Sequence, residues 1–517
     1  MTPIKRGQSV MAFGMSRRAA LKGSIALGAA GAGAARPLFG AGAAFAAEPA
    51  GPLGLSAVDA LAALREKRFS ARTYAEAVLA RSEALGRLNV FINQDEEVLM
   101  TAAALADEHL AAGDDIPLLG LPLAVKDNID TADLPTTGGT PGLRDWTPSA
   151  NAPVMQTLLD AGAMLAGKAN MHELAFGITS NNASFGAVGN PYDATLIPGG
   201  SSGGTAAAVA ARIVPAGLGS DTGGSCRIPA ALCGCVGFRP SHGRYSQAGI
   251  IPISHTRDTI GPLARSVADI RLLDGVCAGG ALPAFEKPIE EIRIGVPAAY
   301  FYENLDYELE IVVAKALERF RAEGAQLIDV DVENIQTLNE SVSFPIALFE
   351  VLRELSAYLY ARGHDMSAPG LVAEVAGADV KGLLTSLMKD NAVPAGLYRE
   401  VITKGRPALQ RAYGRYFEDN QLDAMVVPTT PLPARPIGED ETVDLNGEQV
   451  STFMTYIRNT DPPSVAGLPC LSVPAGLTET GLPVGVEFVG RAGGDATVLH
   501  IAGLFEAVVG MLPAPEI

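Results

Sequence analysis

The chain has 517 residues, of which 48% are hydrophobic and 19% charged, and its formal net charge at pH 7 is −18. An acidic chain repels phosphate backbones, and no basic stripe that could follow one is present, so nucleic-acid binding is not expected. The five cysteines are too few and too scattered for a disulfide framework or a zinc site. We therefore expect no metal and no cofactor. We interpret the cysteines as small buried hydrophobic residues; they are Cys226, Cys233, Cys235, Cys277 and Cys470.

Residues 1–46 have the composition of an export signal. They contain six basic residues and no acidic residue, and the twin arginine Arg17–Arg18 precedes a Gly/Ala-rich stretch that ends in "AFA" at 44–46. This order is typical of a signal peptide, and the arginine pair indicates the twin-arginine route. We expect a periplasmic or secreted protein; a disordered basic tail is the alternative. No later stretch reaches the roughly 20 apolar residues of a membrane span, so none is expected in the mature chain.

The remaining residues, 47–517, are expected to form one domain that begins with a helical arm at about 55–112. Ser56 and Ser70 stand at helix N-cap positions within this arm. A short apolar run at 119–129 predicts a buried strand with Lys126 at its C-terminal end. Further along, the pattern predicts a helix and then a strand at 152–170, and a small-residue helix at 205–212.

Helices and strands continue to alternate in the second half of the chain. Helices are predicted at 266–278 and 495–510 and a helix–strand unit at 306–332, and strands are predicted at 292–297, 422–430 and 483–490. This alternation predicts an α/β fold with a mixed, mostly parallel β-sheet covered by helices on both faces. A core at about 117–300 and 420–517 would hold the sheet. The mostly helical span of about 344–415 is expected to cap the active-site mouth and to select the substrate.

Two glycine-flanked serines, Ser201 and Ser225, lie in the stretch "PGGSSGGTAAAVAARIVPAGLGSDTGGSCR" at 198–227, which contains no histidine. A serine nucleophile needs a base, because its hydroxyl barely ionises near neutral pH. A phosphate-binding loop is one alternative, but its G-x-x-x-x-G-K-[ST] pattern is absent. A nucleophile elbow around Ser201 is another, but a Pro- and Asp-bearing loop precedes that serine where the elbow requires a strand.

A third interpretation combines both serines with Lys126. The stretch 199–230, "GGSSGGTAAAVAARIVPAGLGSDTGGSCRIPA", resembles the signature of the amidase signature family. "GLPLAVKDNID" resembles the lysine strand of that family, and the separation of Lys126, Ser201 and Ser225 matches its spacing. The similarity continues through 238–270 to "GLPCLSVPAG" and "GLPVGVEFVG" near the C-terminus, so it covers essentially the whole mature chain.

The resemblance implies a Ser–cis-Ser–Lys triad, with Ser225 as nucleophile, Ser201 as the bridging serine and Lys126 as base. Burial can lower the pKa of a lysine by several units, and a neutral amine could then accept the proton of Ser225 through Ser201. The family also implies a cis peptide bond between Gly200 and Ser201. Its oxyanion hole maps onto the backbone of Thr222, Gly223, Gly224 and Ser225.

Two charged residues flank the second serine loop. We interpret Asp221 and Arg227 as a structural charge pair that holds the turn. Cys226 stands where the family usually has an aliphatic residue, and we expect its side chain to behave as a small hydrophobe. Neither feature alters the proposed nucleophile.

Within the family, residues 171–200 and 253–267 look most like the indoleacetamide hydrolase and mandelamide hydrolase branch. This implies cleavage of a small aryl amide or arylacetamide to the acid and ammonia or an amine. An esterase or anilide hydrolase on the same triad is the alternative, and a non-catalytic binding protein a third. The expected partner is a small-molecule amide, and the oligomeric state is left open, with a homodimer as one option. Candidate substrate-binding residues are Trp146, Met171, Phe176, Ile178 and Thr179.

Overall fold

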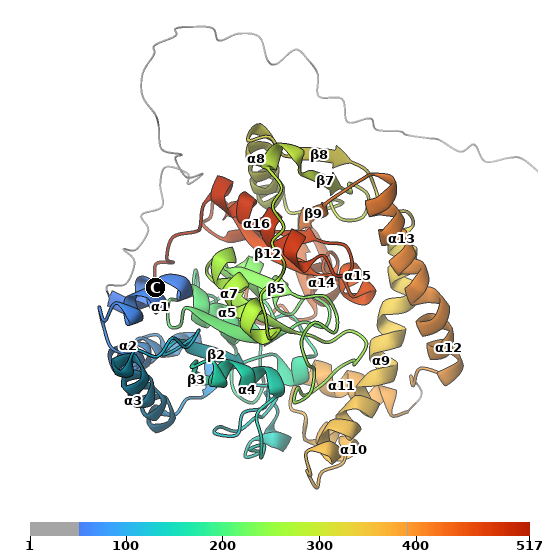
Figure 1. Cartoon of the computed structure of the whole chain (residues 1–517). Helices are drawn as coiled ribbons and strands as arrows, with labels where there is room; N and C mark the ends of the chain where they lie inside the picture. Colours follow the sequence, from blue (N-terminus) through green and yellow to red (C-terminus); the bar gives the residue numbers. More distant parts are fainter. Residues whose placement is uncertain (1–50, 390) are drawn as a thin grey trace, which may run out of the picture. The chain divides into compact units, whose positions relative to one another are not determined.

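An eleven-stranded mixed sheet forms the centre of the computed structural model, which describes residues 51–389 and 391–517 (Figure 1). Its strands follow the order β1 (Phe91–Asn93), β3 (Met164–Ala169), β2 (Pro122–Lys126), β4 (Ala216–Ser220), β6 (Ile260–Ala264), β5 (Val236–Arg239), β12 (Cys470–Leu477), β13 (Pro483–Val489), β9 (Ala424–Pro428), β7 (Arg293–Val296) and β8 (Gln326–Asp329). A separate hairpin pairs β10 (Thr442–Leu445) with β11 (Glu448–Ser451). The predicted signal peptide at 1–46 lies outside the described residues.

Parallel pairing is confined to the two ends of this sheet. β3, β2 and β4 are parallel neighbours near one end, where the edge strand β1 pairs antiparallel with β3, and β9, β7 and β8 are parallel at the other end. The strands between them pair antiparallel, because β12 and β13 are joined by a short turn at 478–482 and no helical crossover separates β5 from β6. The predicted mixed α/β sheet is confirmed, with its parallel strands grouped at the ends. In the parallel group, β2 and β4 present their carboxyl ends at the same edge.

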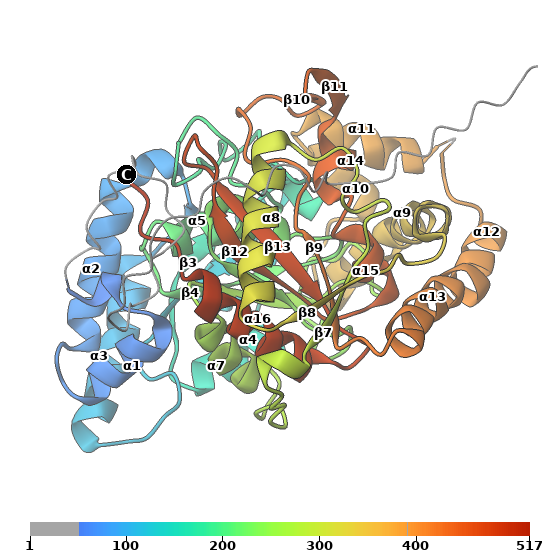
Figure 2. The same cartoon turned by 90° about the horizontal axis from the view of Figure 1, so that it is seen from above.

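Helices cover both faces of the sheet, as predicted. A Cβ added at Gly485 of β13 would lie 2.8 Å from the Cβ of Ala231, so α6 (Arg227–Cys233) packs closely on one face. Phe488 points to the opposite face and makes edge-to-face contacts with Phe320 of α8 (Tyr307–Ala322) and Phe505 of α16 (Asp495–Val509). Figure 2 shows α8 and α16 on that face of β12 and β13.

The predicted helical arm begins with two capped helices. Ser56 Oγ accepts from the N–H of Asp59 at the start of α1 (Ala57–Arg65), and Ser70 Oγ accepts from the N–H of Thr73 at the start of α2 (Ala71–Ala84), both at 3.0 Å. Both predicted N-caps are confirmed. The other helices of the sheet-bearing part are α3 (Glu96–Ala112), α4 (Pro153–Asp160), α5 (Gly203–Ala210), α7 (Val267–Cys277), α14 (Thr452–Ile457) and α15 (Asp461–Ala466).

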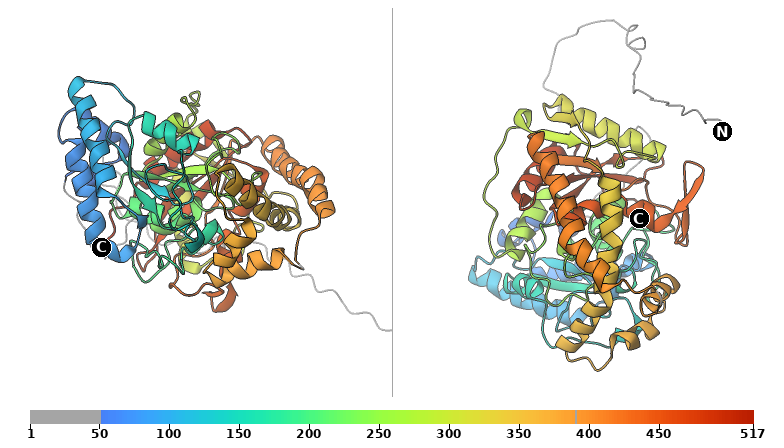
Figure 3. Two further views of the ribbon diagram at one scale, coloured as in Figure 1. Left: turned by 90° about the horizontal axis from the view of Figure 1, so that it is seen from below. Right: turned by 90° about the vertical axis from the view of Figure 1, so that its right-hand side faces the viewer.

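The predicted helical span of 344–415 is helical, and its first helix begins earlier, at Ile335. It contains α9 (Ile335–Ala361), α10 (Ala368–Glu374), α11 (Ala378–Leu387), α12 (Ala395–Glu400), a π-helical turn (Val401–Gly405) and α13 (Arg406–Asp419). The right-hand panel of Figure 3 shows α9 and α13 lying alongside each other. Within the described ranges, none of the helices combines the length and the apolar character that crossing a bilayer requires.

Candidate active site

Lys126 lies at the carboxyl end of β2, beside the carboxyl end of β4, and its amine is fully buried. Its Nζ is 2.7 Å from Ser201 Oγ and 2.9 Å from the Oγ of Ser220, the last residue of β4. Asn128 donates to the same Ser220 oxygen at 3.0 Å. Burial lowers the pKa of the Lys126 ammonium to about 7, although the charges of Asp221 and Asp258 oppose the fall. A neutral amine in this position can accept a proton from Ser201 near neutral pH.

The loop that carries Ser201 is held against the second serine loop. The peptide bond between Gly200 and Ser201 is cis. Ser180 Oγ donates to the carbonyl of Gly199 at 2.8 Å and accepts from the N–H of Gly203 at 3.1 Å, so it bridges both sides of this loop. The N–H of Ser202 donates to the carbonyl of Ser225 at 3.2 Å. The two predicted serines and Lys126 therefore belong to one site, assembled from segments far apart in the sequence.

The carbonyl groups of the turn before Ser225 accept hydrogen bonds from residues that lie outside the turn. Arg257 Nε donates to the carbonyl of Thr222 at 3.3 Å, Thr460 Oγ1 to that of Gly223 at 2.6 Å, and the N–H of Ile228 to that of Gly224 at 2.7 Å. In a planar trans peptide the N–H points opposite to the carbonyl. The N–H groups of the peptides that follow Thr222 and Gly224 therefore point away from these anchors.

Gly224 departs from the predicted oxyanion hole. Its N–H donates to Asp221 Oδ1 at 3.0 Å and is already occupied. The N–H groups of Thr222, Gly223 and Ser225 make no hydrogen bond to any other residue in the described part of the chain. Three of the four predicted donors therefore remain candidates, because the Asp221 carboxylate turns back and occupies the N–H of Gly224.

Asp221 and Arg227 belong to a fully buried charge cluster behind the turn. Arg227 binds both carboxylate oxygens of Asp221, at 2.9 and 3.0 Å, and also binds Glu487 Oε1 at 2.6 Å. Arg239 adds a second guanidinium at 3.0 Å from Asp221 Oδ1. Burial alone would raise the pKa of Asp221, but the two arginines hold it well below its usual range. Asp221 therefore stays ionised and holds the turn by accepting hydrogen bonds from its backbone N–H groups.

The cysteines are all buried, and none of them is in a disulfide. Burial raises the pKa of the Cys226 thiol, which disfavours the reactive thiolate beside Ser225. Among the described residues, no group of three or more His, Cys, Asp and Glu side chains could hold a metal ion.

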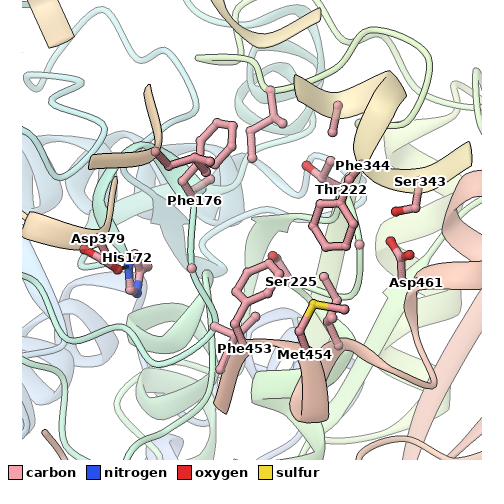
Figure 4. Close-up of a pocket in the computed structure, with 18 of the residues that line it drawn as sticks. His172, Phe176, Thr222, Ser225, Ser343, Phe344, Asp379, Phe453, Met454 and Asp461 are labelled. Carbon is pink, nitrogen blue, oxygen red and sulfur yellow. Dashed lines mark hydrogen bonds and ion pairs between the residues drawn. The ribbon is translucent and has the colours of Figure 1, made fainter. Parts of the chain in front are cut away.

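A cavity of about 340 Å³ opens above Ser225 (Figure 4). Ser225 lines it and is 8% exposed, whereas Ser201 and Lys126 are 0% exposed. Most of the wall is apolar and is formed by Phe176, Ile178, Phe344, Leu348, Leu383, Phe453, Met454 and Ile457. Part of this wall belongs to α9 and α11 of the predicted capping segment.

Three of the five predicted substrate-binding residues, Phe176, Ile178 and Thr179, line this cavity, and two do not. Trp146 packs edge-to-face on His364, with 4.7 Å between ring centroids, because the N–H of Thr136 binds its carbonyl and holds its loop against α9 and α10. Met171 is fully buried in a layer behind the wall, where it packs with Ala175 and other apolar residues. Both are corrected here to packing residues.

Polar residues at the ends of the cavity were not predicted from the sequence. Figure 4 shows His172 and Asp379 on one side of Ser225, and Ser343 and Asp461 on the other. His172 Nε2 lies 3.0 Å from Asp379 Oδ2 and so joins the sheet-bearing part to α11. Arg257 pairs with Asp461 at the other end. These residues come from distant segments, and the sequence carries no local signal that they meet.

Comparisons with known proteins identify one family. A family model described as Amidase matches residues 74–499. An indoleacetamide hydrolase from Agrobacterium vitis is 41% identical over 462 residues, which cover 89% of this chain and 98% of the relative. A mandelamide hydrolase from Pseudomonas putida is 40% identical over 483 residues, which cover 89% and 92%. The native peptide amidase from Stenotrophomonas maltophilia, a solved structure, has a TM-score of 0.77 at 28% identity and covers 89% of this chain and 98% of that one.

The family model spans well over half of the chain. Both named relatives align with this chain over nearly their whole length. The predicted resemblance is therefore confirmed, including its branch. The chain belongs to the amidase family and is a hydrolase of the carbon–nitrogen bond of carboxylic amides.

Proposed function

We propose that this amidase hydrolyses a small aryl amide or arylacetamide through an acyl-enzyme, with Ser225 as nucleophile, Ser201 as bridge and Lys126 as base. The observation that carries the proposal is the buried contact of 2.7 Å between Lys126 Nζ and Ser201 Oγ beneath a cavity lined by Ser225. Exposure supports this division of roles, because only Ser225 reaches the cavity.

We propose the following proton path. Ser225 Oγ attacks the amide carbon while its proton moves to Ser201 Oγ and the Ser201 proton moves to neutral Lys126. The N–H groups of Thr222, Gly223 and Ser225 are the candidate donors to the carbonyl oxygen as it gains charge. Collapse breaks the carbon–nitrogen bond, and the leaving amine takes back the proton through Ser201. Water then attacks the acyl-enzyme by the same relay and releases the acid.

The cavity supports an aryl acyl group. Phe176, Phe344 and Phe453 contribute aromatic surface to its wall, and its volume lies at the lower end of the usual range for small-ligand sites, about 300–1,000 Å³. Indoleacetamide and mandelamide, the substrates named for the two relatives, each carry an aryl ring beside a primary amide. We propose the same substrate class for this chain.

Ammonia release from indole-3-acetamide and mandelamide tests the proposal. Wild-type protein should release ammonia and be labelled by a fluorophosphonate, and Ser225→Ala should do neither. Ser246→Ala, at an exposed serine, is the matched control and should behave like the wild type. Faster turnover of the matching methyl ester than of the amide would favour the esterase alternative. Absence of both turnover and labelling would favour a binding protein.

A further inference from the structure

Arg257 is a buried arginine at one end of the cavity that the reaction as described does not use. We propose that it is a positioning residue that ties the cavity-lining helix α9 to the oxyanion turn and thereby aims the N–H of Gly223. This role rests on the proposed function. Arg257 lies in the loop between β5 and β6, is 3% exposed and lines the cavity.

The guanidinium makes three separate attachments. Its Nε donates to the carbonyl of Thr222 at 3.3 Å. Its Nη1 donates to Oγ and the carbonyl of Ser343 on α9, at 3.0 and 3.2 Å. Its Nη2 pairs with Asp461 Oδ1 at the start of α15. One planar group thus joins the turn, the helix and a second helix end.

Asp461 extends the attachment to α9. Its other oxygen accepts from Asn339 Nδ2 at 2.7 Å, and Asn339 lies one helical turn before Ser343. Residues four apart share one face of a helix, so the Arg257–Asp461 pair binds a single face of α9 twice. Arg257 therefore sits at a fixed distance from this helix.

The residue after Arg257 holds the same threonine by its side chain. Thr222 Oγ1 donates to Asp258 Oδ1 at 2.6 Å. Asp258 Oδ2 accepts from the N–H groups of Ile253 and Ser254 at 2.8 and 2.9 Å, which fixes the loop at 253–258. The loop is bound to α9 as well, because Thr256 Oγ1 donates to Glu350 at 3.0 Å.

These contacts fix the orientation of the peptide between Thr222 and Gly223. Because the peptide is planar, holding the Thr222 carbonyl toward Arg257 directs the Gly223 N–H the other way. A positive donor on the carbonyl also polarises the peptide and strengthens its N–H as a donor. A Cβ at Gly223 would lie 3.3 Å from Arg257 Nη2 and 2.8 Å from Ile457, so the turn packs directly on the guanidinium.

The same helix face connects substrate fit to this peptide. Phe344, Ala347 and Leu348 of α9 line the cavity, and Ser343 and Glu350 of α9 hold Arg257 and its loop. A lysine at 257 carries its three donors on one nitrogen, so it cannot reproduce contacts that arginine makes from three separate nitrogens of a planar group. Arg257→Lys therefore keeps the charge and loses the alignment.

Kinetics of Arg257→Lys and Arg257→Met on indole-3-acetamide test this role. Removing an oxyanion-hole donor lowers kcat about 10²- to 10³-fold, and misaligning one should lower it about 10- to 100-fold, with KM changed less than about threefold. Affinity for an arylboronic acid, whose boron accepts an electron pair from Ser225 Oγ and places an oxygen in the oxyanion hole, should fall in parallel. Affinity for indole-3-acetic acid should stay within about threefold.

Arg244→Lys is the matched control, because Arg244 forms a two-contact ion pair with Asp274 at 2.7 Å in the same loop region and does not line the cavity. It should retain wild-type values. If Arg257→Met does not fold, Arg257→Lys and Ser343→Ala, which removes one attachment, carry the test. Wild-type kcat and boronate affinity in Arg257→Lys would overturn the positioning role alone, as would equal losses for boronate and product. A wild-type protein without turnover or label would overturn the proposed function and this role with it.

Discussion

We expect the pKa of Lys126, the proposed base, to set the pH range of catalysis. Burial lowers that pKa from 10.5 to about 7. The difference of about 3.5 units corresponds to about 5 kcal/mol of extra free energy to charge the amine in the folded protein. The same shift should appear in catalysis and in stability, and the two can be measured separately.

In catalysis, only the neutral amine can accept a proton. The neutral fraction falls tenfold for each pH unit below 7, so kcat/KM for indole-3-acetamide should be about 1% of its plateau at pH 5. We expect an acid limb with a slope of one and a midpoint near 7, measured as ammonia release between pH 5 and 9. A flat profile down to pH 5, or turnover by Lys126→Met, would refute the assignment of the base.

In stability, the unfolded chain holds the Lys126 proton more tightly than the folded chain between pH 7 and 10.5. The wild type should therefore gain stability relative to Lys126→Met as the pH rises through this window, by about 2–3 kcal/mol from pH 8 to pH 10. Urea unfolding at both pH values measures this change. The exposed Lys381→Met is the control and should show a constant difference. A constant difference for Lys126→Met as well would contradict the shifted pKa.

Two further predictions concern the charge cluster and the N-terminus. Asp221→Asn leaves the buried Arg227 and Arg239 with less opposing charge and should lower the free energy of unfolding by about 3–5 kcal/mol, measured by urea unfolding; a loss below about 1 kcal/mol would contradict the structural role. Replacing both Arg17 and Arg18 with lysine should keep the protein in the cytoplasm, measured by fractionation in a host with a twin-arginine system; unchanged export would contradict the predicted route.

Local patterns were sufficient for much of the fold. Ser56 and Ser70 predicted helix starts because N-capping is local, and β2 was recognised as a continuous apolar run. β4, β6 and β12 were not singled out from apolar patterning. Their sequences, "AGLGS", "IGPLA" and "CLSVPAGL", contain Gly and Pro, which normally argue against a strand. Tertiary packing between helix layers keeps these residues extended.

At the site, too, residues in local motifs could be predicted, whereas contacts between distant segments could not. The two serines and Lys126 could be predicted because each lies in a recognisable motif. Ser220 and Arg257 also lie in stretches that resemble the family, but their contacts are with Lys126 and Ser343, 94 and 86 residues away. The pairing of His172 with Asp379 spans 207 residues. Such pairs depend on how the segments pack, which a single sequence does not record.

Two fully buried lysines lie near the site, and their partners distinguish them. Lys168 Nζ is 3.3 Å from Asp127 Oδ1 and 2.7 Å from Thr136 Oγ1, so its ammonium has a counter-charge. Within the described ranges, no carboxylate lies at ion-pair distance from Lys126 Nζ, whose partners are the hydroxyls of Ser201 and Ser220 and the carbonyl of Ser220. Burial lowers the pKa of both lysines. Asp127 favours the charged form of Lys168 from direct contact, whereas Asp221 and Asp258 act on Lys126 only from beyond ion-pair distance. Because burial is common to both residues, we infer that the lack of a counter-ion in contact is what suits Lys126 to the proposed role of base.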